Sequence, residues 1–100
     1  NHAKLAFIGV QAEVGSVRTV ARQIAEIPLV TGVMITMGQF NILAICVFDE
    51  LENLVDFASD QILSIDGVHH VETSIAVKTL KYNPRVVRIT EADHAADNGE

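Results

Sequence analysis

The fold of this chain is decided by the stretch Gly38-Gln39-Phe40-Asn41-Ile42-Leu43-Ala44-Ile45-Cys46-Val47-Phe48. Its last seven residues are apolar without a polar break, which is too short for an ordinary helix and rich in residues that favour strands. Side chains of a strand alternate between its two faces, so this strand is apolar on both. A chain of 100 residues can cover one face of a small sheet with its own helices, and the other face then needs a second layer. We therefore predict a homodimer in which two sheets stack.

The rest of the chain predicts two units, each made of a strand, a helix and a strand. A first helix is expected after Ser16, a plausible N-cap, and must stop before Pro28. A second is announced by Asp49 and Glu52 in a capping-box pattern and ends at Gly67. Strands are expected over residues 5–12, 30–37, 42–48 and 68–80. The order βαββαβ predicts a ferredoxin-like α+β fold, with an antiparallel sheet, both helices on one face and the other face free to dimerise.

Composition limits the classes of protein that this chain can belong to. The formal charge is -6 and no basic run exists, so this piece has no electrostatic footprint for nucleic acid. The longest apolar run is far short of the roughly 20 residues that cross a bilayer, and no signal peptide is visible. Cys46 is a core thiol in this reading, which fits a reducing cytoplasm. We expect one cytoplasmic domain over residues 1–89, no membrane contact, and an acidic, disordered tail over residues 90–100.

The sequence contains no combination of residues that is typical of a catalytic or metal-binding site. His69 and His70 are adjacent at the start of a strand, so they point to opposite faces and cannot easily chelate one ion together. Ser16 is explained as a helix cap, and no Gly-x-Ser-x-Gly or phosphate-binding loop exists. No pair of carboxylates is placed in the two different environments that a general acid and a general base would need. We therefore expect neither an enzyme nor a metal or cofactor site.

The turn from Met37 to Asn41 has two interpretations. As a hairpin connection, it needs Gly38 for a positive φ and Asn41 for a turn-compatible side chain. As a binding site, its exposed backbone groups, Gln39 and Asn41 suit a small zwitterion. Phe40 is unusual in a solvated turn and is expected to pack on something, which at an oligomer boundary can be another subunit. Gly9, in the first strand, would let another backbone or side chain approach closely.

From about residue 4 to residue 89, the chain resembles the C-terminal effector-binding domain, or RAM domain, of the Lrp/AsnC feast/famine transcription regulators. The match covers nearly the whole chain, although its motifs are short and the βαββαβ order is shared by unrelated families. The turn stands in place of that family's Gly-x-Tyr-Asp. The residues that carry the resemblance are Phe7 to Val10, Ile27-Pro28-Leu29-Val30, Gly38-Gln39-Phe40-Asn41, Gly67-Val68 with Thr73, and Val77-Lys78-Thr79-Leu80-Lys81.

The resemblance implies a ligand-sensing and oligomerisation domain of a transcriptional regulator. Such domains form dimers through their sheets, and the dimers assemble further, often into tetramers or octamers. Amino acids or related metabolites bind between dimers and act by shifting the assembly, whereas DNA is bound by a helix-turn-helix domain that would precede Asn1. Carried onto this chain, the ligand-binding positions are Gly38, Gln39, Phe40, Asn41, Val71 and Thr73.

Three departures from the family pattern and several rival interpretations stay open. Phe40 lacks the tyrosine hydroxyl, neutral Asn41 replaces a carboxylate that could attract an ammonium group, and Val71 stands where many relatives have a hydroxyl. These changes favour a different ligand or a purely structural turn. The rivals are a small dimeric ferredoxin-like monooxygenase or isomerase, an ACT-like regulatory module and a plain oligomerisation module. The enzyme would need a polar cavity between sheet and helices, where apolar side chains are expected.

Overall fold

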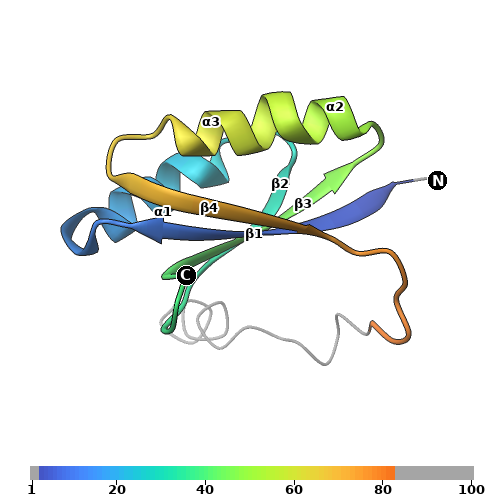
Figure 1. Ribbon diagram of the computed structural model, residues 1–100, viewed down its shortest axis with the longest axis horizontal. Helices are drawn as coiled ribbons and strands as arrows, with labels where there is room; N and C mark the ends of the chain where they lie inside the picture. Colours follow the sequence, from blue (N-terminus) through green and yellow to red (C-terminus); the bar gives the residue numbers. More distant parts are fainter. Residues whose placement is uncertain (1–2, 83–100) are drawn as a thin grey trace, which may run out of the picture.

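The computed structural model describes residues 3–82 (Figure 1). The predicted end of the domain at residue 89 and the predicted tail over residues 90–100 lie outside the described residues. The structure confirms the βαββαβ order. Its elements are β1 (Lys4–Ala12), the 3-10 turn η1 (Val14–Ser16), α1 (Val17–Ala25), β2 (Val30–Ile35), β3 (Ile42–Phe48), α2 (Leu51–Leu54), the π-helical η2 (Val55–Ser59), α3 (Asp60–Leu63) and β4 (Val68–Ile75).

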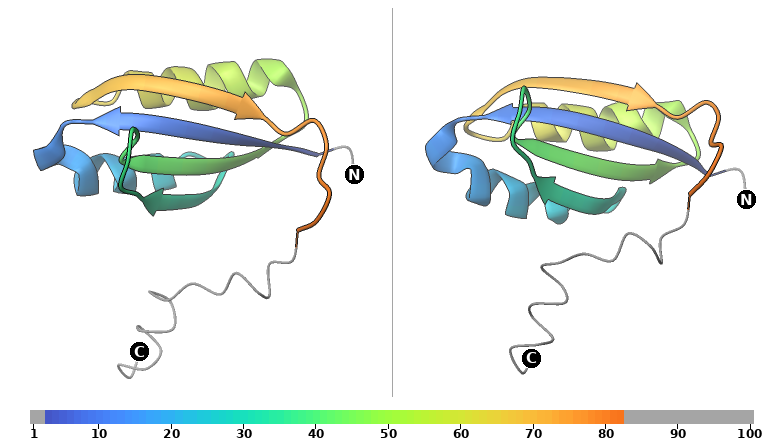
Figure 2. Two further views of the ribbon diagram at one scale, coloured as in Figure 1. Left: turned by 60° about the horizontal axis from the view of Figure 1, so that its bottom comes forward. Right: turned by 90° about the horizontal axis from the view of Figure 1, so that it is seen from below.

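The four strands form one antiparallel sheet in the order β2-β3-β1-β4. The segments α2, η2 and α3 follow one another without a break and make the second helix. This helix and α1 lie on the same side of the sheet (Figures 1 and 2). The ferredoxin-like α+β fold predicted from the sequence is thereby confirmed.

The core lies between the sheet and the two helices. Burial alternates along β3, where every second side chain from Ile42 to Phe48 is buried and the three between are half-buried. The same face of β1 carries Ala6, Ile8 and Val10, all fully buried. The helices contribute Val20, Ala21, Ile24, Leu54, Ala58 and Ile62. Cys46 is part of this core, and burial raises the pKa of its thiol above the ordinary value.

The opposite face of the sheet is apolar, and none of the helices within residues 3–82 covers it (Figure 2). The register sets Phe7 opposite Ile45, Leu5 opposite Val47 and Met34 opposite Leu43. We call these six residues, Leu5, Phe7, Met34, Leu43, Ile45 and Val47, the open face. Phe7 and Met34 are more than a third exposed, and the other four are half-buried. The prediction that this strand is apolar on both faces is confirmed, and one of the two faces has no second layer among the described residues.

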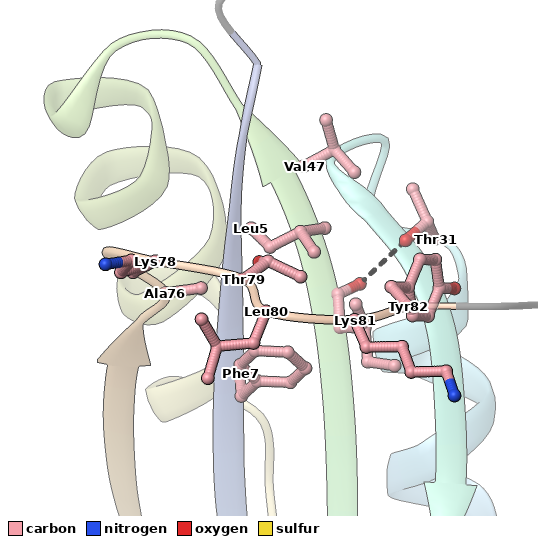
Figure 3. Close-up of a pocket in the computed structure, with 11 residues that line it drawn as sticks. Leu5, Phe7, Thr31, Val47, Ala76, Lys78, Thr79, Leu80, Lys81 and Tyr82 are labelled. Carbon is pink, nitrogen blue, oxygen red and sulfur yellow. Dashed lines mark hydrogen bonds between the residues drawn. The ribbon is translucent and has the colours of Figure 1, made fainter.

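The strand ends differ from the prediction because the chain leaves the sheet early. The strand expected to reach residue 37 ends at Ile35, and Met37 is fully exposed in the turn that follows. The strand expected to reach residue 80 ends at Ile75. Residues 76–82 then cross one end of the open face (Figure 3). Alternation of side chains continues through both segments in the sequence. Beyond Ile35 and Ile75, one bond each still joins the chain to its neighbour, from the N–H of Thr36 to the carbonyl of Asn41 and from the N–H of Ala76 to the carbonyl of Leu5.

The second helix also begins differently from the prediction. Its N-cap position is Glu50, not Asp49, and it makes no side-chain cap hydrogen bond, so the predicted capping box is wrong. At the first helix, Ser16 does stand at the N-cap of α1, but its side chain makes no cap bond. The preceding η1 turn instead provides an acceptor for one N–H group of the first turn of α1, because the backbone N–H of Val17 donates to the carbonyl of Val14. Among residues 3–82, no helix is long and apolar enough to cross a membrane.

Candidate functional site

The turn between β2 and β3 folds back over β1 on the side of the open face (Figure 2). We call residues 36–41 the hairpin tip. Gly38 has φ +143°, a conformation that side chains other than glycine rarely adopt, so the predicted positive φ is confirmed. Met37, Gly38 and Gln39 are exposed, whereas Phe40 and Asn41 are half-buried. The tip is therefore accessible at its front and fixed at its base.

Asn41 fixes the base of the tip to β1 through its side-chain amide. Its Nδ2 donates to the carbonyl of Ala12 at 2.8 Å, and its Oδ1 accepts from the N–H of the same residue at 3.0 Å. Its own backbone N–H donates to the carbonyl of Val10 at 3.1 Å. One residue thus extends the β1–β3 ladder beyond the last strand pair, Val10 with Ile42.

Phe40 packs on Gly9 in the middle of β1. A Cβ atom at Gly9 would lie 2.9 Å from Cγ of the Phe40 ring, so this position has room only for a hydrogen. On β4, the His70 ring lies stacked with the Phe40 ring, with centroids 6.3 Å apart and planes 13° apart. The prediction that Gly9 admits a close neighbour is confirmed. The neighbour is a side chain of the same protomer, so the aromatic residue in the turn needs no second subunit to explain its packing.

Three backbone carbonyls of the tip accept hydrogen bonds within the protomer. The Gln39 carbonyl accepts from Nε2 of Gln11 at 3.0 Å, and the Phe40 carbonyl accepts from Oγ1 of Thr36 at 2.8 Å. The Asn41 carbonyl accepts from the N–H of Thr36 at 3.0 Å. Half of the backbone carbonyls of the tip are therefore used internally, whereas those of residues 36–38 accept no hydrogen bond within residues 3–82.

Val71 and Thr73, the other two expected site residues, lie on the opposite face of the sheet. They pair with Val10 and Ile8, whose side chains are buried under the helices. Thr73 is exposed, and its hydroxyl lies 3.1 Å from the hydroxyl of Ser59 in η2. The structure thus brings Gly38 to Asn41 together with Gly9, Gln11 and His70, but it does not bring Val71 and Thr73 to them within one protomer.

The sequence did not indicate three residues that lie beside the expected site residues: Gln11 and His70 near the hairpin tip, and Ser59 beside Thr73. Gln11 could have been found, because it stands two residues after Gly9 and a strand places such residues on one face. His70 is predicted from the sequence only to lie at the start of a strand, unable to share an ion with His69, and its partner on β1 is Gln11. Ser59 gave no signal, since it reaches Thr73 from the π-helical segment, which the sequence does not reveal.

The two histidines of β4 bind different carboxylates. Nε2 of His69 lies 2.6 Å from Oε1 of Glu13, and Nε2 of His70 lies 3.1 Å from Oε2 of Glu72. All four side chains are more than half exposed, so each pair is a surface interaction of modest strength. The pairs occupy the carboxylates of Glu13 and Glu72.

A groove of ≈ 700 Å³ lies at the other end of the open face, between the sheet and residues 76–82 (Figure 3). Its floor is apolar and includes Leu5, Phe7 and Ile45. The segment that crosses it packs loosely, since Leu80 is 87% exposed and Tyr82 is 70% exposed. This groove is part of the open face and not a cavity between the sheet and the helices, which is where the rival enzyme would need one.

The fold and the site now allow comparison with known proteins. The family model for the Lrp/AsnC ligand binding domain matches residues 5–86 of this chain. The chain belongs to this family. An HTH-type transcriptional regulator of Pyrococcus abyssi is 32% identical to it over 78 residues, which are 78% of this chain and 49% of that protein. A second regulator of this type, from Pyrococcus furiosus, is 32% identical over 81 residues, covering 81% of this chain and 54% of that protein. This Lrp/AsnC domain thus spans about half the length of the curated relatives.

Solved structures share the fold of this Lrp/AsnC domain. TTHA0845 from Thermus thermophilus matches with a TM-score of 0.74 and 28% identity, over 79% of this chain and 99% of that chain. The transcriptional regulator NMB0573 of Neisseria meningitidis, solved as a complex with L-Met, matches with a TM-score of 0.70 and 25% identity, over 79% of this chain and 53% of that chain. The resemblance drawn from the residues alone is confirmed at the level of the family.

Proposed function

We propose that this Lrp/AsnC domain senses an amino acid or a related small metabolite and responds through the assembly of its copies. The observation that carries the proposal is the division of the expected site. Gly38 to Asn41 lie on the side of the open face, whereas Thr73 lies on the helix side with Ser59. A ligand that contacts both sets must lie between two protomers. The complex of the Neisseria relative with L-Met supports an amino acid as the kind of ligand.

The open face supports a homodimer as the basic unit. Its six apolar side chains are only partly covered by their own protomer. Burying a large apolar side chain fully contributes about 1.5 to 3 kcal/mol, so stacking two such faces is strongly favourable. We expect an interface of about 2,000 Å² or more in total, as in obligate dimers. Further association of these dimers into tetramers or octamers would create the boundary at which the ligand binds.

A ligand at such a boundary regulates only through its different affinities for different assemblies. We propose that binding shifts the oligomeric state, and so the spacing of attached DNA-binding domains of the kind found in the HTH-type relatives. This domain itself would touch neither DNA nor membrane and would catalyse no reaction. Its setting would be the cytoplasm, where free thiols such as Cys46 persist.

Two measurements on a panel of amino acids test this function. A ligand at 100 times its dissociation constant should stabilise the fold by about 2.7 kcal/mol, which raises the melting temperature. The same ligand should change the sedimentation coefficient. A ligand that stabilises the fold without altering sedimentation would contradict the role of assembly. If no compound stabilises the fold, a plain oligomerisation module is the better account.

A further inference from the structure

One segment lies over the open face without being part of the sheet. Residues 76–82, which we call the strap, cross this face at the end where β1 begins (Figures 2 and 3). The N–H of Ala76 donates to the carbonyl of Leu5 at 2.9 Å. After this bond, no backbone N–H group of the strap donates to a backbone carbonyl within residues 3–82. Among these residues, the backbone of the strap is therefore bonded to its own sheet at one point only.

The strap exposes three large side chains with apolar surface. Val77 is 94% exposed, Leu80 is 87% exposed and Tyr82 is 70% exposed. Single exposed apolar side chains are common, whereas several close together mark an interaction site. Tyrosine is also enriched at protein interfaces, because it combines an apolar ring with a polar hydroxyl group. The described part of the protomer thus leaves these side chains to be covered from outside.

The groove under the strap makes the strap and the open face one continuous surface. Its volume is ≈ 700 Å³, and its floor includes four residues of the open face, namely Leu5, Phe7, Ile45 and Val47. Stable interfaces are packed as densely as protein interiors, so a partner that covers the open face has to fill this groove with its own side chains. Because the strap crosses that face, a second sheet cannot stack on it without contacting the strap (Figure 2).

The charge of the strap favours a second copy of this chain as the partner. The strap carries Lys78 and Lys81 and no acidic residue, whereas the whole chain has a formal charge of -6. On β4, Glu72 pairs with Gly9, which alternates with the buried Ile8 and Val10, so Glu72 lies on the side of the open face. A second copy therefore brings an apolar face with an acidic side chain, which complements the strap in both polarity and charge.

We propose that the strap is a second part of the dimer interface. The partner buries the side chains of Val77, Leu80 and Tyr82 and fills the groove, and two-fold symmetry repeats this contact at the other strap. The inference rests on the proposed function, because it concerns the same dimer. It goes beyond the stacking of two sheets, because it assigns part of the binding energy to a segment outside the sheet.

Leu80→Asp tests the inference, and Val14→Asp is the matched control. The two side chains are 87% and 86% exposed in the protomer, so neither change should disturb the fold, which circular dichroism checks. Val14 follows the far end of β1, away from the strap. Sedimentation equilibrium measures the dimer dissociation constant. We expect Leu80→Asp to raise it by at least about 10-fold, the loss expected for one buried leucine, and Val14→Asp to leave it within about 2-fold.

Hydrogen exchange of the backbone amides of residues 77–81 gives a second test that needs no change in the strap. In the unmodified dimer, these amides should exchange at least about 10-fold more slowly than in Ile45→Glu, a variant designed to prevent stacking of the sheets. The amide of Ala76 is the internal reference, because it is already hydrogen-bonded within the protomer. Equal exchange of residues 77–81 in the two proteins would overturn the inference.

The outcomes separate this inference from the proposed function. If Ile45→Glu dissociates the dimer and Leu80→Asp does not, the dimer through the open face stands and the strap has no part in it. Equal weakening by Leu80→Asp and Val14→Asp would show a general effect of charge and would also overturn the inference. Tighter association of Leu80→Asp would mean that the strap obstructs the dimer. If the unmodified chain is a monomer, both the inference and the proposed dimer fall.

Discussion

At the scale of single residues, the hairpin tip depends on Asn41 and Gly9. Asn41 uses an amide for a task that a carboxylate cannot perform, since it both donates to and accepts from the backbone of Ala12. Gly9 has no side chain because the Phe40 ring fills that space. Each of these requirements has a physical cause within one protomer, independent of any ligand.

Asn41→Asp tests the first requirement through its pH dependence. The ionised carboxylate would face the Ala12 carbonyl and lose the 2.8 Å hydrogen bond, which costs about 1 to 3 kcal/mol at pH 7. A protonated carboxyl group can donate to that carbonyl, so its pKa in the folded state is raised above the unfolded value of about 3.9. The stability is therefore retained at low pH and lost as the pH rises through the folded-state pKa.

Denaturant unfolding of Asn41→Asp beside the unmodified chain checks this at about pH 4 and pH 7. The stability difference between the two proteins should be larger at the higher pH. Comparison at each pH removes the acid sensitivity that both proteins share. Equal stability of the two proteins at pH 7 would show that the amide is not needed.

Gly9→Ala tests the second requirement. The added methyl would lie 2.9 Å from the Phe40 ring, and forced overpacking of this kind costs about 1 to 3 kcal/mol. In a domain of this size the melting temperature should fall by about 4 to 8 °C for each kcal/mol. Combining Gly9→Ala with Phe40→Ala removes the clash, so the pair should couple favourably in a double-mutant cycle. Purely additive effects would mean that the ring does not rest on Gly9 in solution.

At the scale of elements, the second helix departs most from what the sequence predicts. A helical period places Leu51, Leu54 and Val55 on one buried face, yet Leu51 is 55% exposed, Val55 is 44% exposed and Leu54 is buried. The π-helical segment η2 begins at Val55 and takes more residues per turn, which shifts the residues after Leu54 relative to an ideal α-helix. No pattern in the sequence marks this insertion.

Two leucines three residues apart on this helix give a direct comparison. Leu54→Ala removes a side chain that is 1% exposed and should cost about 2 to 5 kcal/mol, whereas Leu51→Ala should change stability by no more than about 0.5 kcal/mol. Unfolding by denaturant measures both. Similar losses of stability for the two variants would mean that Leu51 is buried in solution, as the regular helical pattern of the sequence predicts.

Strand order, core and hairpin could all be predicted from the sequence, because alternation and glycine positions report directly on backbone geometry. The apolar run from Ile42 to Phe48 fixed the central strand, and Gly38 marked the turn. Strand ends could not be predicted, since the alternation of side chains continues in the sequence past Ile35 and Ile75, where β2 and β4 end. The resemblance places Thr73 in one site with the turn, and because the two lie on opposite faces of a protomer, such a site requires two protomers.

At the scale of the whole molecule, the open face is the feature that the protomer leaves incomplete. A charge placed there should block stacking of two sheets, so Ile45→Glu should sediment as a monomer. Leu63→Glu is the matched control, because Leu63 is 55% exposed on α3, on the helix side of the sheet. Both variants should remain folded by circular dichroism. Dissociation caused by the Leu63 variant alone would place the interface on the helices.

The central claim is that this Lrp/AsnC domain works as an assembly whose smallest unit is a dimer joined through the open face. Sedimentation velocity of the unmodified chain at micromolar concentration tests it most directly, first alone and then with a saturating ligand from the panel. We predict a dimer or a larger species without ligand, and a changed distribution of assemblies once ligand is added. A monomer under both conditions would contradict the claim.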